Sequence, residues 1–128
     1  MFKTLIIDPN LPFRQSLRNL LIKNLPQIDV EVAADKNEGL EKLAAFQPHL
    51  VLLDVHLPGE SGLKLARRIK SDHPEVIIAL LTSYNLPEYH AAAKDSGIEY
   101  VVPKDYWTGE DIMALIDQLY HQLYGERR

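Results

Sequence analysis

Short apolar runs recur along the chain between longer stretches of helical periodicity. The run from Leu50 to Leu53 shows no alternation of polar and apolar positions, and it stands between Pro48 and the Pro58-Gly59 pair. Such a run indicates a strand that is buried on both faces of a sheet. The same reasoning, with β-branched and aromatic residues as a guide, predicts strands at residues 3–7, 29–33, 50–54, 76–81 and 100–102.

The segments between these runs carry apolar residues three and four positions apart, which predicts amphipathic helices. Their predicted ranges are 11–24, 35–46, 61–71, 85–97 and a last helix from residue 108, whose apolar face includes Ile112 and Leu123. Capping residues stand at four of the predicted starts: Asn10, Asp35, Asn85 and Thr108. Strands that alternate with helices predict an α/β fold, with a parallel sheet, right-handed crossovers and helices on both faces.

The polar residues that follow the predicted strands are the candidates for chemistry. They are Asp8, Asp54, Thr82 and Lys104. In an open parallel sheet, ligands bind beyond the carboxyl ends of the strands, so these side chains are expected to gather at one edge. Two carboxylates, a hydroxyl and an ammonium suit phosphoryl chemistry, with one carboxylate as nucleophile and a divalent cation held nearby. The competing interpretation is that Asp54 only caps the turn that follows it.

Composition narrows the class of protein. The chain has 128 residues, 46% of them hydrophobic and 25% charged, which predicts one globular domain over residues 1–128. A net charge of -4 argues against direct nucleic-acid binding, because phosphate neutralisation needs clustered Lys and Arg. The chain has no Cys, no signal-peptide pattern and no apolar run of membrane-spanning length. We therefore expect a cytoplasmic protein without a membrane partner.

The motifs at the strand ends resemble those of response-regulator receiver domains of two-component signalling. The matching residues are Ile6-Ile7-Asp8, Leu52-Leu53-Asp54-Val55, Leu57-Pro58-Gly59, Ser61-Gly62, Leu81-Thr82-Ser83 and Lys104-Asp105. The resemblance covers essentially the whole chain. It implies a doubly wound five-stranded parallel sheet of flavodoxin-like order 2-1-3-4-5. It also implies a signalling switch and not an enzyme.

The same resemblance implies roles for individual residues. Asp54 would accept a phosphoryl group from a sensor histidine kinase or a phosphotransfer protein, and Thr82 and Lys104 would contact that group. Asp8, Asp54 and the backbone carbonyl of His56 would bind Mg²⁺. The turn after Asp54 and the Lys104-Asp105 ending are most similar to receivers that precede a helix-turn-helix output domain. A DNA-binding domain is therefore an expected partner if the chain is part of a longer protein.

Two departures from the family pattern leave the mechanism open. Receivers of this family normally have a second acidic residue directly after the first, and here that position is Pro9, which supplies no side-chain ligand. Mg²⁺ is then expected to bind weakly. The aromatic residue that often lies three positions before the Lys is Val101 here, and its neighbour Tyr100 points to the opposite face. The alternative function is a degenerate receiver that acts as a phosphorylation-independent interaction module.

The output surface is expected on the face that comprises the fourth helix, the fifth strand and the fifth helix, roughly residues 87–124. Thr82 and Lys104 follow the predicted strands that lead into the fourth and fifth helices. The aromatic residues of this segment suit a homodimer interface. Because Val101 replaces the usual aromatic residue, we expect phosphorylation to cause only a weak conformational change. We also expect the protein to self-associate partly without a phosphoryl group. The competing interpretation is a monomer whose aromatics are core. Beside the site, His56 and Tyr84 are expected to flank the phosphoryl group.

Overall fold

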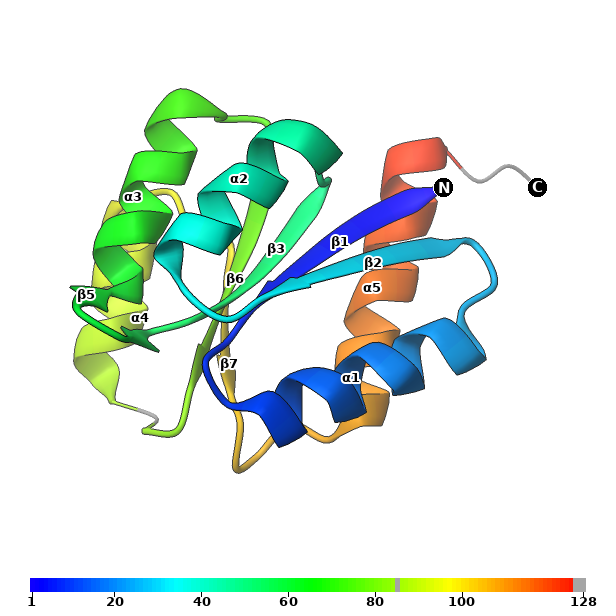
Figure 1. Cartoon of the computed structure of the whole chain (residues 1–128), viewed down its shortest axis with the longest axis horizontal. Coiled ribbons are helices and arrows are strands. Elements are labelled where there is room, and N and C mark those ends of the chain that lie inside the picture. Colours follow the sequence, from blue (N-terminus) through cyan, green and yellow to red (C-terminus); the bar gives the residue numbers. More distant parts are fainter. Residues whose placement is uncertain (85, 126–128) are drawn as a thin grey trace.

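The apolar runs form one parallel sheet in the computed structural model, which describes residues 1–84 and 86–125 (Figure 1). The strand order is β2-β1-β3-β6-β7, which is the predicted order 2-1-3-4-5 when only the sheet strands are counted. These strands are β1 Phe2–Ile7, β2 Ile28–Ala33, β3 Leu50–Asp54, β6 Ile77–Thr82 and β7 Tyr100–Pro103. A small antiparallel ribbon of β4 His56–Leu57 and β5 Glu60–Ser61, which the sequence did not predict, follows β3.

Helices cover both faces of the sheet, as predicted (Figure 1). Alternate residues of β1 divide between two cores: Leu5 and Ile7 face one, and Phe2 and Ile6 face the other. The first core lies against α2, α3 and α4, and the second against α1 and α5. The helices are α1 Leu11–Asn24, α2 Lys36–Phe46, α3 Gly62–Asp72, α4 Pro87–Asp95 and α5 Gly109–Tyr124.

The predicted caps form where the chain is described. The Asn10 side chain accepts a hydrogen bond from the Phe13 amide at 3.0 Å, and Asp35 accepts one from the Glu38 amide at 2.9 Å. Thr108 makes a full capping box with Asp111 at the start of α5. The predicted cap at Asn85 lies outside the described residues. Each of these side chains satisfies an amide that has no partner within its helix, so the caps fix the residue at which each helix begins.

One prediction near the chain end needs correction. Leu123 was predicted on the buried face of α5 but is 51% exposed, because it lies in the last turn of the helix, at the margin of the sheet. The aromatic residues near the chain end fit both of the interpretations offered for them. Trp107 and Tyr120 pack against the core on the α1/α5 side, while Tyr106 and Tyr124 are exposed.

The edge position of β7 agrees with its proline. Pro103 has no amide hydrogen and pairs with Thr82 on the only neighbouring strand, β6. A proline is tolerated there because its nitrogen faces no partner strand. Lys104 follows directly, so the end of this edge strand fixes where the ammonium enters the site.

Candidate functional site

Three of the four predicted site residues meet at the carboxyl ends of β1, β3 and β7. The Lys104 ammonium lies 2.7 Å from Asp8 Oδ2 and 2.7 Å from Asp54 Oδ2. The two acids lie at the ends of the adjacent parallel strands β1 and β3, and Lys104 reaches them from the edge strand β7, which is two places from β3 and three from β1. Because the strands are parallel, their carboxyl ends lie on the same side of the sheet. The long Lys side chain spans the remaining distance to the two acids. One cation thus links two carboxylates at the centre of the site.

Both the backbone and the side chain of Lys104 are held in place. Its backbone amide donates to the Thr82 carbonyl at 2.8 Å, and its ammonium lies 4.3 Å from the centroid of the Phe13 ring. Burial alone would lower the pKa of Lys104, but its hydrogen bond to Asp54 and its ion pair with Asp8 outweigh the effect of burial and raise that pKa. The ammonium therefore stays charged. Phe13 was predicted only as an apolar residue of α1, and its cation–π contact depends on how α1 crosses the site.

Asp8 is fully buried. Its Oδ1 accepts a hydrogen bond from the Asn10 amide at 2.8 Å, and its backbone carbonyl accepts one from Arg14 at 2.6 Å. Its Oδ2 makes the ion pair with Lys104 but accepts no well-directed hydrogen bond from the residues that the structure describes. Burial raises the pKa of Asp8 above its usual range, although Lys104 and the Asn10 amide act in the opposite direction. The ionised Asp8 side chain therefore lowers the free energy of unfolding near neutral pH.

This cost gives a testable prediction for Asp8→Asn. A carboxyl group whose pKa is higher in the folded state than in the unfolded state stabilises the folded protein at low pH. This stabilisation is lost as the pH rises through the pKa of the folded state. Without added metal, Asp8→Asn should therefore stabilise the protein near neutral pH by about 0.5–2 kcal/mol. The gain should shrink as the pH falls toward 3.8, the ordinary value for Asp. Urea unfolding of the parent and the variant between neutral pH and pH 3.8 measures this gain in stability. Asp29→Asn is the control, because Asp29 is exposed. A gain that grows in acid would contradict the assignment.

Asp54 ends β3 and is 6% exposed. Its Oδ1 accepts a hydrogen bond from the His56 amide at 2.7 Å, which is the local bond expected of an Asp in a turn. The chain then returns past the Asp54 backbone at Gly62. A Cβ at Gly62 would overlap the backbone carbonyl of Asp54, so the glycine at this position has a steric reason. Asp54 caps its turn and also contacts Lys104, so the two interpretations of this residue are compatible.

The structure places Thr82 differently from the other three residues. Its hydroxyl donates to the Tyr84 carbonyl at 2.7 Å and accepts from the Tyr84 amide at 3.0 Å. The side chain is fully buried at the end of β6. In this state the hydroxyl is engaged with its own turn and makes no hydrogen bond to Asp54 or Lys104 among the described residues. A contact with a bound phosphoryl group would require it to release Tyr84.

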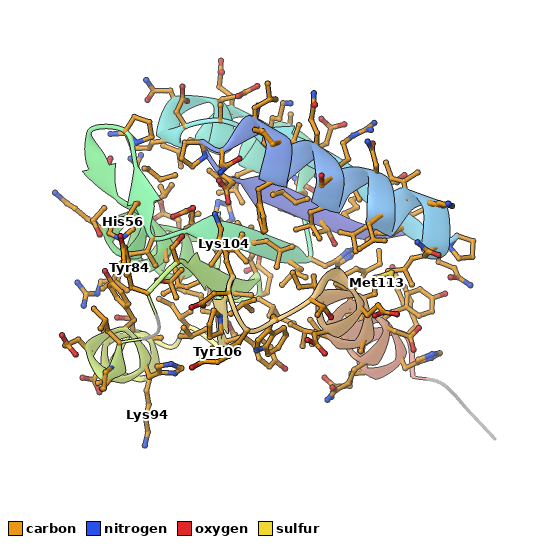
Figure 2. The ribbon with its side chains drawn as sticks, turned by 90° about the horizontal axis from the view of Figure 1, so that it is seen from below. His56, Tyr84, Lys94, Lys104, Tyr106 and Met113 are labelled. Atoms are coloured by element: carbon orange, nitrogen blue, oxygen red, sulfur yellow. The ribbon has the colours of Figure 1, made fainter. Side chains whose placement is uncertain are left out.

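Aromatic side chains form the rim of the site. The exposed His56 ring lies between Tyr84 and Tyr89, with ring centroids 6.1 Å and 6.4 Å away and both pairs edge-on. Figure 2 shows His56 and Tyr84 side by side, near Lys104. Tyr89 of α4 was not predicted to take part. Its position three residues into a helix gives no sign in the sequence that it reaches the turn after β3.

The residues that could hold a divalent cation are few. No group of three or more His, Cys, Asp or Glu side chains suited to a metal occurs among the described residues. Asp8 and Asp54 provide two carboxylates around one point of positive charge, and the buried Asp8 Oδ2 lacks a well-directed donor. Mg²⁺ keeps several waters and is often bound through one or two carboxylates. The two carboxylates therefore fit the oxygen ligands that Mg²⁺ takes from proteins.

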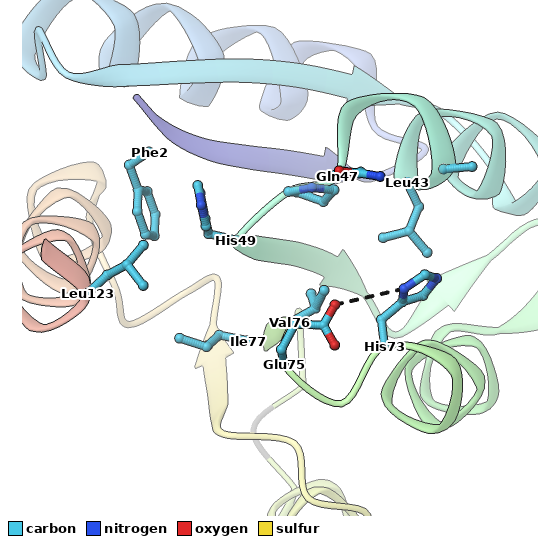
Figure 3. A pocket seen from close by; sticks show the side chains of 11 residues that line it. Phe2, Leu43, Gln47, His49, His73, Glu75, Val76, Ile77 and Leu123 are labelled. Atoms are coloured by element: carbon cyan, nitrogen blue, oxygen red, sulfur yellow. Dashed lines mark ion pairs between the residues drawn. The ribbon is translucent and has the colours of Figure 1, made fainter.

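A separate pocket of about 370 Å³ lies at the opposite edge of the sheet, near the amino ends of β1, β3 and β6 (Figure 3). Phe2 stacks on His49 on one side of it, and His73 and Glu75 form an ion pair at 3.9 Å on the other. None of Asp8, Asp54, Thr82 or Lys104 lines it. The pocket is therefore not part of the candidate site.

Comparisons with known proteins agree with this geometry. A model of the response regulator receiver domain matches residues 4–117. The response regulator MprA of Mycolicibacterium vanbaalenii is 32% identical over 104 residues, which cover 81% of this chain and 44% of that protein. The chain thus spans less than half the length of this curated relative.

Solved receiver domains have the same fold. A CheY-like receiver domain protein from Methanospirillum hungatei aligns with a TM-score of 0.87 at 23% identity, covering 99% of both chains. The BeF3-activated receiver domain of DrrB, a response regulator of Thermotoga maritima, aligns with a TM-score of 0.83 at 25% identity. That alignment covers 94% of this chain and 98% of the other.

Proposed function

The chain belongs to the response regulator receiver domain family, and we propose that it is a phospho-acceptor switch that takes a phosphoryl group on Asp54. Proteins of this family are signalling modules of two-component systems that carry phosphotransfer chemistry. The observation that carries the proposal is the position of Asp54, at a strand end, slightly exposed, and 2.7 Å from an ammonium. We take residues 1–128 as one receiver domain.

The transfer step follows from the charges in the site. A carboxylate oxygen of Asp54 attacks the phosphorus of phosphohistidine on a kinase or phosphotransfer protein, and the P–N bond breaks with its electron pair going to the imidazole. The product is an acyl phosphate on Asp54. Lys104 contacts the attacking carboxylate of Asp54 and can then pair with a phosphoryl oxygen. Thr82 would exchange its bond to the Tyr84 carbonyl for one to the phosphoryl group.

Asp8, Asp54 and the backbone carbonyl of His56 are the proposed ligands of Mg²⁺. When bound, Mg²⁺ would neutralise charge on the transferred phosphoryl group. Lys104 lies between both carboxylates and would share them with the ion. Pro9 is exposed beside Asp8 and offers no oxygen from its side chain.

Replacing Pro9 tests whether the missing ligand limits the site. Pro9→Asp adds a carboxylate next to Asp8, so we expect Mg²⁺ to bind about tenfold more tightly, since each 1.4 kcal/mol of added binding energy gives that factor. Phosphorylation by acetyl phosphate should also become faster at limiting Mg²⁺. Pro9→Ala is the matched control, because it removes the ring without adding a ligand. Equal Mg²⁺ affinity in both variants would count against Pro9 as the limiting position.

Incubation with acetyl phosphate and Mg²⁺, followed by intact mass measurement, tests the proposed function directly. We expect one added phosphoryl group. The second candidate is an interaction module that needs no phosphorylation, and Pro9 and Val101 favour it because they depart from the family pattern at the metal and at the switch. No adduct, together with self-association of the untreated protein, would favour this second candidate.

The partners form part of the same proposal. The phosphodonor would be a sensor histidine kinase or a phosphotransfer protein, and residues 87–124 would form a homodimer face that includes the exposed Tyr106 and Tyr124. A DNA-binding output domain is proposed for a longer form of the protein, since the matched relatives exceed this chain in length. The domain itself is proposed to bind no nucleic acid.

The described helices are each too short or too polar to cross a lipid bilayer. A cytoplasmic location, where the proposed phosphodonors would meet Asp54, belongs to the proposal.

A further inference from the structure

One residue touches both the acceptor carboxylate and helix α4. The backbone amide of His56 donates to Asp54 Oδ1 at 2.7 Å, while its ring Nε2 lies 3.5 Å from the hydroxyl of Tyr89 in α4. The second contact is long for a hydrogen bond, and it joins the turn after β3 to a helix thirty-three residues later. A change at Asp54 therefore has a short physical route to α4.

Tyr89 is the main large side chain that holds α4 in place. Only Ala93 of this helix is buried, and the neighbouring Ala91 and Ala92 give little apolar surface. Tyr89 is half-buried and packs against the core shared with α2 and α3. Val101 of β7 packs against the same core. Against this core, α4 thus contributes an aromatic ring, whereas β7 contributes Val101.

The Thr82 turn reaches the same imidazole from the other side. Tyr84 lies edge-on to the His56 ring, and the Thr82 hydroxyl holds the backbone of Tyr84 through two hydrogen bonds. If the hydroxyl turned toward a phosphoryl group, Tyr84 would be freed and the His56 ring would lose one of its two aromatic neighbours. The two groups that would respond to phosphorylation, Asp54 and Thr82, therefore both act on His56.

We propose that His56 and Tyr89 transmit the state of Asp54 to helix α4, in place of an aromatic switch residue on β7. This inference rests on Asp54 as the acceptor. A phosphoryl group can shift the position of α4 only through contacts that differ between the two states. We expect the His56–Tyr89 contact to differ in this way, because the amide of His56 bonds to the carboxylate that becomes the acyl phosphate. His56 and Tyr89 act here as positioning residues and not in the chemistry.

The test compares Tyr89→Phe with the parent, since this change removes the hydroxyl and keeps the ring in the core. Amide chemical shifts of Ala91, Ala92 and Lys94 are recorded with and without beryllofluoride and Mg²⁺. In the parent these amides should move, and in Tyr89→Phe their movement should fall below about half, because one of the contacts that differ between states is gone. The control is Ser16→Ala, which removes an exposed hydroxyl from α1, outside the proposed homodimer face. It should behave like the parent.

A second variant separates transmission from chemistry. His56→Ala removes the ring but keeps the amide that bonds to Asp54, so its α4 response should also fall, and combining it with Tyr89→Phe should add little further loss. Intact mass after acetyl phosphate should show the same adduct in Tyr89→Phe as in the parent. Parent-like movement of α4 in Tyr89→Phe would overturn the inference and leave the acceptor role intact. A parent that neither forms an adduct nor responds to beryllofluoride would overturn both.

Discussion

Asp54→Ala should abolish phosphoryl incorporation from acetyl phosphate. Asp54 supplies the nucleophilic oxygen in the proposed reaction, and the other carboxylate of the site cannot replace it. Asp8 lies the same 2.7 Å from Lys104 but is fully buried, whereas Asp54 is 6% exposed. A phosphodonor can therefore reach only one of the two acids. Loss of a nucleophile that forms the covalent intermediate removes the reaction path altogether.

Intact mass before and after treatment measures this loss. Asp54→Asn should behave in the same way while keeping the size of the side chain, which separates loss of the nucleophile from loss of packing. The control is Asp105→Ala, because Asp105 is an exposed acid directly after Lys104. A phosphoryl adduct that persists in Asp54→Asn, mapped by peptide fragmentation to Asp8 or elsewhere, would refute the assignment.

Lys104→Ala is expected to impair both stability and phosphorylation. The ammonium is the cation between two carboxylates that are almost fully buried, and its own side chain is 14% exposed. Removing one partner of a buried ion pair leaves uncompensated charge and typically costs about 3–5 kcal/mol. The free energy of unfolding should therefore fall by about that amount near neutral pH, with part of the loss returning in acid as Asp8 becomes protonated. Phosphorylation should slow because the phosphoryl oxygens lose a positive partner.

A double substitution identifies the cause of the lost stability. In Lys104→Ala, the further change Asp8→Asn should recover much of the unfolding free energy, since it removes one of the two facing carboxylates. Lys94→Ala serves as control, because Lys94 extends away from the molecule in Figure 2. Urea unfolding of the parent, the two single variants, the double variant and the control decides between charge compensation and simple packing. If Asp8→Asn gives no more stability to Lys104→Ala than to the parent, repulsion between the acids is not the cause.

The order of strands and helices was predictable from the chain alone. Runs such as Leu50 to Leu53, apolar at every position, require cover on both faces of a sheet, and helices between successive strands permit only parallel crossovers. The same logic brings Asp8, Asp54 and Lys104 to one edge, because residues that follow parallel strands share an end of the sheet. Local signals sufficed for the caps at Asp35 and Thr108.

Other features depend on distances between residues far apart in the chain. The sequence placed Thr82 at the site, but only the structure turns its hydroxyl toward Tyr84, because a rotamer is chosen by its surroundings. Phe13 lies near Lys104 because α1 crosses that edge of the sheet, and its helical periodicity says only that the ring is apolar. The exposure of Leu123 follows from where α5 runs past the sheet margin. The contact between His56 and Tyr89 likewise exists only because α4 packs beside the turn after β3, and no local pattern of polar and apolar residues encodes that pairing.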